Sequence, residues 1–183
     1  YQGKVMSDVI PEVRGESYNE SLKRCFVGGP TPLVRRVCFN SSGYFDESLP
    51  SCQDWDMWIR IAKYYEFEFD PTILAKVNVH GNQVSTSLNN KILARKIILE
   101  KYKPDLEERR SILSLHLRRL GSLCCLDGKP GEGFNYIMKS IQAAPWNVYS
   151  YIHLILLLMS KKLYKNLLRK YGVFRVEEII FYH

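Results

Sequence analysis

Two acids flank a tryptophan in residues 51–63, which read SCQDWDMWIRIAK. Asp54 and Asp56 stand at the expected start of a helix, because apolar residues recur at helical spacing over residues 54–65. Acids in a first turn accept hydrogen bonds from free backbone N–H groups and suit the positive end of the helix dipole. An acid held there as the anion can also take a proton from a hydroxyl group. The residue types therefore allow two roles, helix cap and catalytic base.

The composition indicates a folded, basic protein. The chain has 183 residues, of which 46% are hydrophobic and 13% aromatic, enough apolar surface for a packed core. Its net charge of +7 favours anionic partners such as nucleotides, phosphates or an acidic membrane surface. No helix-turn-helix, RNP or zinc-finger pattern accompanies this charge, so nucleic acid is not an expected partner.

The cysteines and the apolar segments indicate the compartment. The five cysteines show no Cys-x-x-Cys spacing, and Cys124 and Cys125 are adjacent in a helical pattern, so we expect thiols that pack as small hydrophobes. The longest apolar stretch, residues 151–159, contains His153 and is too short to cross a bilayer. We therefore expect a cytoplasmic protein, or one at the inner face of the membrane, without a transmembrane helix. The chain begins at Tyr1 rather than Met, which predicts a piece of a longer protein.

Turn signals divide the first hundred residues into short elements. A helix is expected at 17–26, with Ser17 as its cap and Glu20 at the capping-box distance. A Gly-Gly-Pro turn precedes an expected strand at 32–36, and two short strands are expected within 67–79. Helices are expected at 54–65 and 86–101. Strands that alternate with helices predict an α/β domain over residues 1–103.

Past residue 103 the pattern becomes helical. Residues 106–128 place leucines and isoleucines near one face, and Gly128 is suited to end that helix. Two more helices are expected before a strand-like VEEIIFY at the end of the chain. These patterns predict a helical extension over residues 104–183.

Four segments in order resemble the C-terminal half of a family 2 glycosyltransferase of the GT-A fold. They are GGPTPLVRR, SSGYFDESL, QDWDMWIRIAK and ILAKVNVHGNQVS, and the resemblance runs from about residue 25 to 88. The family shows a Gly-rich turn and strand, a GxFDE segment, an EDxDLWLR helix start and a strand ending in a His-containing loop. The resemblance implies an inverting, hexosyltransferase-like enzyme that uses a nucleotide-sugar and acts in polysaccharide biosynthesis.

By position, the resemblance makes Asp54 the general base that takes the proton from the acceptor hydroxyl. Gln53 stands where the family often has Glu. Inversion is a single in-line displacement, so a base must lie beside the acceptor oxygen, opposite the leaving nucleotide. Asp56 is expected either to cap the helix or to hold the base in position without touching the substrate. Arg60 is expected to form a structural ion pair, for instance with Asp46 or Glu47.

The remaining candidate site residues are assigned more broadly. Gln53 and Trp55 are candidates for substrate binding, as is the Gly28-Gly29 turn, where backbone can approach the acceptor closely. Trp55 can instead belong to the core, and core is the expected place for Trp58. The resemblance places His80 near the metal-bound diphosphate, with Gln83 as a second candidate there. Each of these residues also has a purely structural interpretation.

The resemblance implies a divalent metal, Mg²⁺ or Mn²⁺, bound through a DXD motif that follows a nucleotide-binding half. We expect neither a DXD motif in this chain nor room for that half before residue 20. We therefore expect the chain to be the acceptor-side half of a transferase and to be inactive alone. The expected partners of the complete enzyme are a nucleotide-sugar donor and a saccharide or lipid-linked acceptor.

Residues 117–154 resemble a tetratricopeptide unit. The resemblance rests on a Leu-Gly pair, a Gly-Lys inter-helix turn, a small residue at Gly133 and an Ala-Ala-Pro-x-Asn close. Fewer than two repeats cannot form a free-standing solenoid, so a helical cap on the transferase domain is expected. The alternative to an enzyme fragment is a non-catalytic interaction module whose helical tail binds a protein partner.

Overall fold

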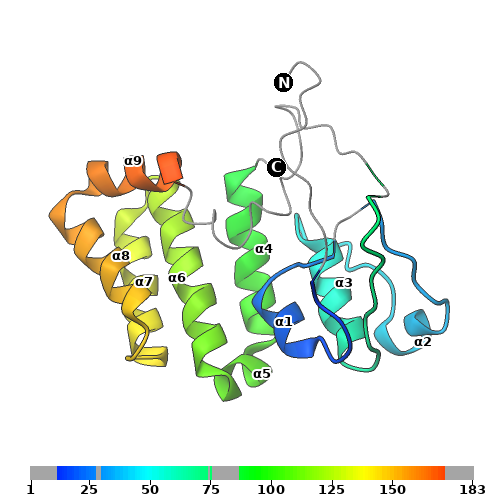
Figure 1. The fold of residues 1–183 in the computed structure, drawn as a ribbon. Coiled ribbons are helices and arrows are strands. Elements are labelled where there is room, and N and C mark those ends of the chain that lie inside the picture. Colours follow the sequence, from blue (N-terminus) through cyan, green and yellow to red (C-terminus); the bar gives the residue numbers. More distant parts are fainter. Residues whose placement is uncertain (1–11, 28–29, 74, 76–86, 172–183) are drawn as a thin grey trace. The chain divides into compact units, whose positions relative to one another are not determined.

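The computed structural model describes residues 12–27, 30–73, 75 and 87–171. The chain divides into two compact units, and the second begins at Ser87 (Figure 1). The first unit contains α1 (Tyr18–Lys23), α2 (Cys38–Ser42) and α3 (Gln53–Ala62). The second contains α4 (Leu88–Lys101), α5 (Lys103–Glu108), α6 (Arg110–Leu126), α7 (Pro130–Ala143), α8 (Val148–Met159) and α9 (Lys161–Tyr171).

The expected α/β fold is wrong for the part of the chain that the structure describes. These residues are helical and form no strand, and their β pairing is a single antiparallel bridge between Gly15 and Phe67. The stretch expected to be a strand at 32–36 forms no bridge to another described segment and runs into the turn before α2, and Leu33 is fully exposed. A strand is stable only where a neighbour accepts its backbone hydrogen bonds, and the prolines at 30 and 32 supply no N–H donors. The strand expected at the end of the chain lies outside the described residues, as do residues 76–79.

The division between the units does not coincide with the expected boundary at residue 103. Helix α4, expected to belong to the transferase domain, groups with the helices that follow it. Two contacts of α4 with the later helices explain this grouping. Lys96 of α4 pairs with Glu132 of α7 at 2.6 Å, and Ile92 of α4 packs with Leu120 of α6. The helix itself was expected at 86–101 and is observed at Leu88–Lys101, with Ser87 as its cap.

Helix α3 is the centre of the first unit. Met57 and Ile59 are fully buried, and a core of Cys38, Met57, Trp58 and Ile61 forms where α2 meets α3. Trp58 is therefore a core residue, as expected. Phe67, next to this core, lies edge-on to the Trp58 ring with centroids 6.3 Å apart. Buried aromatic and aliphatic side chains thus fix the orientation of α3 within its unit.

Helix α1 is shorter than expected and begins differently. Ser17 stands at the N-cap position, but its hydroxyl donates to the Gly15 carbonyl at 2.8 Å and does not accept a backbone N–H of the helix. The capping box expected with Glu20 is therefore not formed. Gly15 is also the residue of the β bridge, so Ser17 ties the helix start to that bridge.

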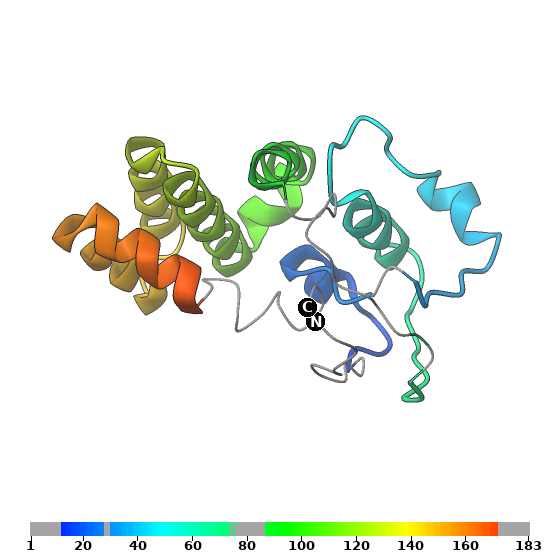
Figure 2. The same ribbon diagram turned by 90° about the horizontal axis from the view of Figure 1, so that it is seen from above.

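Helix α6 is the centre of the second unit. Its buried residues face α4 on one side and α7 to α9 on the other, through two core clusters. Helices α6 and α7 form an antiparallel hairpin, α8 packs on α7, and α9 runs across them (Figure 2). Gly128, with φ at +85°, follows the end of α6, as expected of a residue that stops a helix.

Two glycines allow the close crossing of α6 and α7. A Cβ added at Gly133 would lie 2.2 Å from the Cys125 sulfur and 2.7 Å from the Gly121 carbonyl oxygen. A Cβ added at Gly121 would lie 2.8 Å from the Gly133 carbonyl oxygen. The backbones of the two helices are therefore in contact, and neither position has room for a side chain.

We predict that Gly133→Ala lowers the free energy of unfolding of the second unit by roughly 2–3 kcal/mol, because the new methyl forces α6 and α7 apart. Gly131→Ala is the matched control, since it lies in the same helix and has no atom within 4 Å of its Cβ position. The control should be neutral or stabilising by up to about 1 kcal/mol, through helix propensity. Urea unfolding of both variants makes the comparison, and equal stability of the two would contradict the close crossing.

Hydroxyl groups and one histidine join the helices of the second unit inside the bundle. Ser140 donates to the Ser114 carbonyl at 2.7 Å and lies 2.7 Å from the Ser150 hydroxyl. Nδ1 of His153 lies 2.6 Å from the Tyr164 hydroxyl. Burial, with the positive charge of Arg118, lowers the pKa of His153 to about 4. The folded protein therefore holds this imidazole neutral at ordinary pH.

This histidine predicts a pH dependence of stability. The unfolded chain protonates His153 near pH 6.5 and the folded chain only near pH 4, so stability is highest above pH 6.5 and falls as the pH drops. We expect a loss of about 2 kcal/mol at pH 5 relative to pH 8. His153→Gln should remove most of that loss. Unfolding of the two proteins at both pH values tests this, and identical pH profiles would exclude His153 as the cause.

All five cysteines are free thiols. Cys124 and Cys125 are buried, and burial raises the pKa of each thiol to about 11. They act as small apolar side chains between α6 and its neighbours, as the sequence predicts.

Within the described ranges, no helix combines the length and the apolar character that crossing a bilayer requires.

Candidate functional site

The candidate site is the N-terminus of α3, where the backbone is strained. Cys52 precedes the helix with φ at +63° and ψ at 26°, in the left-handed region that residues other than glycine rarely adopt. It is the one described residue other than glycine with a positive φ. From this position the Cys52 carbonyl accepts the N–H of Asp56 at 3.0 Å, which starts the helix. Strain of this kind persists where the surroundings enforce it and is frequent at functional sites.

Asp54 lies on the first turn of α3 at the edge of the core. Its Oδ1 accepts the Trp55 backbone N–H at 2.8 Å, and its Oδ2 lies 4.0 Å from the Cys25 sulfur, at the limit for a weak hydrogen bond. The residue as a whole is partly exposed. The carboxylate is thus oriented by the Trp55 N–H on a residue at the surface of the unit, a position from which proton transfer from a bound hydroxyl is geometrically possible.

The two neighbours of Asp54 have structural roles. Gln53 donates from Nε2 to the Leu49 carbonyl at 2.7 Å, which closes the turn ahead of the helix. The Trp55 ring is 2% exposed and donates from Nε1 to the Ser21 carbonyl at 2.6 Å. A ring buried to this degree offers no open face for a sugar to stack on. Both residues therefore hold α3 in place, Gln53 against the preceding turn and Trp55 against α1.

Asp56 and Arg60 form a buried ion pair one helical turn apart. The Asp56 side chain has no exposed surface, and its Oδ2 accepts from Nε of Arg60 at 2.9 Å. The structural ion pair expected for Arg60 is confirmed, but its partner is Asp56 and not Asp46 or Glu47, because the i,i+4 spacing places Asp56 on the same helix face. Arg60 also donates to the carbonyls of Ser42 and Tyr44. One guanidinium thereby ties the turn after α2 to α3.

Asp54-Trp55-Asp56 has the letters of a DXD motif, although the expectation was of a chain without one. The two carboxylates do not converge on a common point: Asp56 faces the buried guanidinium of Arg60, and Asp54 lies at the edge toward Cys25. No group of three His, Cys, Asp or Glu side chains in the described ranges could hold a metal ion. The carboxylates of Asp54 and Asp56 therefore do not form a metal-binding pair in this arrangement.

Four of the expected site residues lie outside the described residues: Gly28, Gly29, His80 and Gln83. Their expected roles in acceptor and diphosphate binding stay predictions. The structure adds one residue that sequence reasoning missed, Cys25, whose thiol contacts the Asp54 carboxylate. The two residues are 29 positions apart, and no spacing pattern marks such a contact.

Comparison with known proteins finds relatives over part of the chain. A protein of Rickettsia felis described as an uncharacterized glycosyltransferase is 35% identical over 69 residues, which cover 38% of this chain and 12% of that protein. A similarly described protein of Rickettsia conorii is 35% identical over 69 residues, covering 38% and 11%. One of Rickettsia typhi is 31% identical over 71 residues, covering 39% and 22%.

The chain thus matches between 11% and 22% of the length of these three relatives. No protein-family model and no solved structure matches it. About 38% of the chain is therefore similar to proteins that are named as glycosyltransferases.

Proposed function

We propose that this chain is part of an inverting glycosyltransferase, related to family 2, that moves a sugar from a nucleotide-sugar to an acceptor hydroxyl. Asp54 is its general base. The observation that carries the proposal is the position of Asp54, a partly exposed residue whose carboxylate is oriented on the first turn of α3, two residues after the strained Cys52. The similarity to proteins named as glycosyltransferases supports the same reaction class.

The proposed step is a single displacement. The acceptor oxygen attacks the anomeric carbon while the bond from that carbon to the diphosphate oxygen breaks, and the diphosphate departs with the bonding electrons. Asp54 takes the proton of the acceptor hydroxyl as the new bond forms, which keeps positive charge from building on that oxygen. Attack from the face opposite the leaving group inverts the anomeric configuration. Because Oδ1 is held by the Trp55 N–H, Oδ2 is the oxygen assigned to receive the proton.

The surroundings of Asp54 support this role. Asp54 lies on the first turn of α3, at the positive end of the helix dipole. Trp55 anchors this turn to α1, and Arg60, paired with Asp56, anchors the next turns to the segment after α2. A base must be held within hydrogen-bond reach of its target, and these two anchors restrict the movement of Asp54.

A divalent cation, Mg²⁺ or Mn²⁺, would neutralise the departing diphosphate in the complete enzyme. The residues that the structure describes do not fit such an ion, since they bring no set of three ligands together. The base step at Asp54 does not depend on a metal ligand from this unit.

The proposal is tested on the full-length protein that contains this chain. Purified protein is incubated with UDP- and GDP-sugars, manganese and saccharide or lipid-linked acceptors, and release of the nucleoside diphosphate is measured. Release that depends on an acceptor, together with a product of inverted anomeric configuration by NMR, is the expected result. A product of retained configuration would exclude the single displacement, and a folded protein that releases nothing from any donor would contradict the proposal.

A further inference from the structure

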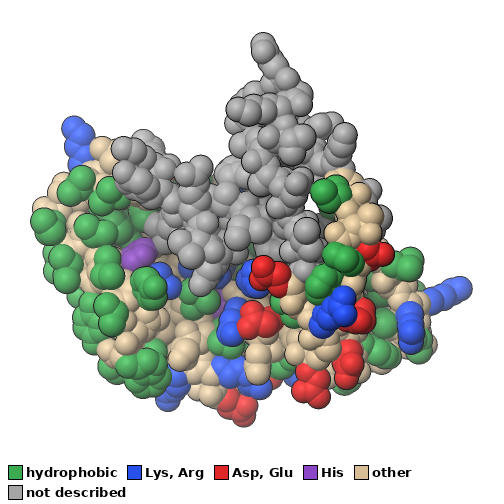
Figure 3. Space-filling view, viewed as in Figure 1, with side chains coloured by type: hydrophobic (Ala, Val, Ile, Leu, Met, Phe, Trp, Pro, Cys, Tyr) green, Lys and Arg blue, Asp and Glu red, His purple; other side chains and the backbone are tan. Residues whose placement is uncertain are grey.

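One side of α8 exposes a continuous apolar surface. Six exposed side chains recur at spacings of three and four residues along the helix, so they lie on one face. They are Val148, Tyr151, Ile152, Ile155, Leu158 and Met159, called here the α8 face. Leu158 and Met159 are 67% and 71% exposed. Figure 3 shows hydrophobic side chains gathered on this side of the second unit, where Figure 1 places α7 and α8.

The α8 face is not the core side of the helix. The opposite side of α8 supplies the core contacts. Leu157 is buried in the same core cluster as Tyr164, and the Ser150 hydroxyl is hydrogen-bonded to that of Ser140. A helix on the surface of a bundle normally carries polar residues on its outer side. Helix α8 is apolar on both sides, so its outer side is suited to a second apolar environment.

The charges around the α8 face show what kind of surface fits it. Residues 133–171 contain no Asp or Glu and six Lys or Arg residues. Lys161 and Lys162 begin α9, one residue after the end of α8, and are exposed. At the other end of the helix, Trp146 and Tyr149 are 67% and 64% exposed. Basic side chains beside exposed aliphatic residues, with Trp and Tyr at the edge, match the chemistry of an anionic lipid surface.

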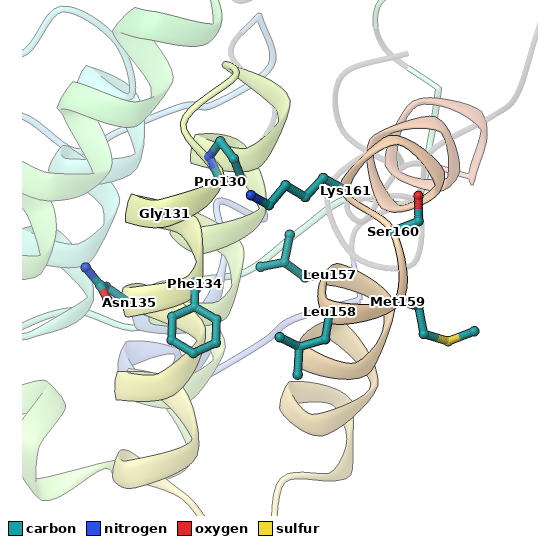
Figure 4. Close-up of a pocket in the computed structure, with 9 residues that line it drawn as sticks. All are labelled: Pro130, Gly131, Phe134, Asn135, Leu157, Leu158, Met159, Ser160 and Lys161. Atoms are coloured by element: carbon teal, nitrogen blue, oxygen red, sulfur yellow. The ribbon is translucent and has the colours of Figure 1, made fainter.

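A hollow next to the α8 face adds room for part of a lipid. It has a volume of about 670 Å³ and lies between the start of α7 and the turn from α8 to α9 (Figure 4). Phe134, Leu157 and Leu158 line it, and Lys161 stands at its side with Ser160. Leu158 and Met159 belong to both the hollow and the α8 face, so the two form one continuous surface.

We propose that the α8 face, with Lys161 and Lys162, docks the protein on an anionic lipid bilayer. The aliphatic side chains enter the boundary between head groups and acyl chains, and the two lysines contact lipid phosphates. The helix lies in the plane of the surface and does not cross it. This proposal rests on the second unit alone and does not depend on the role of Asp54.

Co-sedimentation with vesicles tests the proposal on the full-length protein. Binding to vesicles of phosphatidylcholine with phosphatidylglycerol is expected, with weak binding to pure phosphatidylcholine and a loss of binding at high salt. The double variant Lys161→Glu/Lys162→Glu should lower the partition coefficient by roughly tenfold or more. Its matched control is Lys103→Glu, an exposed lysine at the start of α5.

The apolar part is tested by Ile155→Ser/Leu158→Ser, which changes exposed side chains and should leave circular dichroism and the unfolding midpoint unchanged. This variant should lose binding to the anionic vesicles. Leu93→Ser, an exposed leucine on α4, is its control and should bind as the wild type does. Wild-type protein that ignores anionic vesicles would overturn the proposal. A second result would also overturn it: no vesicle binding, together with a concentration-dependent dimer seen by light scattering that the Ile155→Ser/Leu158→Ser change abolishes. That result would assign the α8 face to contact with a second copy of the chain.

Discussion

Replacing Asp54 with Asn in the full-length protein is expected to lower the rate of sugar transfer by roughly 10²–10⁴-fold, the usual effect of removing a general base. Asn has almost the same shape as Asp and can accept the Trp55 N–H through its carbonyl oxygen, so α3 should begin as it does in the wild type. It cannot accept a proton from an acceptor hydroxyl. The loss should therefore appear in kcat, with little change in the KM for the donor.

The matched control for this prediction is Glu47→Gln. Glu47 is an exposed carboxylate in the turn between α2 and α3, and its loss removes the same charge from the same unit. Transfer by Glu47→Gln should stay close to that of the wild type. If both variants lose activity to the same degree, net charge and not the position of Asp54 would be the cause.

Replacing Arg60 with Met is expected to destabilise the first unit by about 3–5 kcal/mol, the usual cost of removing one partner from a buried ion pair. The carboxyl group of Asp56, which has no exposed surface, loses the guanidinium beside it, and the carbonyls of Ser42 and Tyr44 lose their guanidinium donor. The methionine fills part of the space but makes no hydrogen bond to these oxygens. Urea unfolding, followed by the fluorescence of Trp55 and Trp58, measures the loss.

Two further variants test whether the loss of stability comes from the buried ion pair. Arg36→Met removes an exposed arginine from the same unit and should change stability by less than about 0.5 kcal/mol. The double variant Asp56→Leu/Arg60→Met should be more stable than Arg60→Met alone, because the buried carboxylate is gone. A double variant less stable than either single change would contradict this account of the pair.

The periodic helices could be predicted from the sequence. The apolar residues of α3 recur every three or four positions, and that pattern alone gave a helix at 54–65, observed at Gln53–Ala62, with Trp58 in the core. Helix α4 was predicted as the long helix that follows a polar loop, to within two residues at its start. Helical periodicity is a local property, since each residue faces its i+3 and i+4 neighbours in the chain.

The strands could not be predicted reliably, because a strand depends on a partner elsewhere in the chain. The apolar run at 32–36 has the composition of a strand, yet no described segment lies beside it to pair with its backbone. Phe67 does find a partner in Gly15, for a single bridge. Composition therefore suggested a strand at 32–36 that the described part of the chain does not form.

The candidate site shows the same limit. Asp54 was selected from its place in a motif, but its neighbour Cys25 comes from a distant segment and carried no signal in the sequence. The partner of Arg60 was assigned to the GxFDE-like segment, although Asp56 stands four residues away on the same helix face. The i,i+4 rule could have identified that pair. The crossing of Gly121 and Gly133 was visible only in part, as a small residue expected at Gly133.

Chemical rescue of Asp54→Ala is the most direct test of the central claim, that a carboxylate at this position takes the acceptor proton. The alanine variant leaves space beside the N-terminus of α3 for a small carboxylate from solution. The account predicts that formate restores transfer in the Asp54→Ala protein in proportion to its concentration, and leaves the wild type and Glu47→Gln unchanged. An Asp54→Ala protein that transfers sugar at the wild-type rate without formate would contradict it.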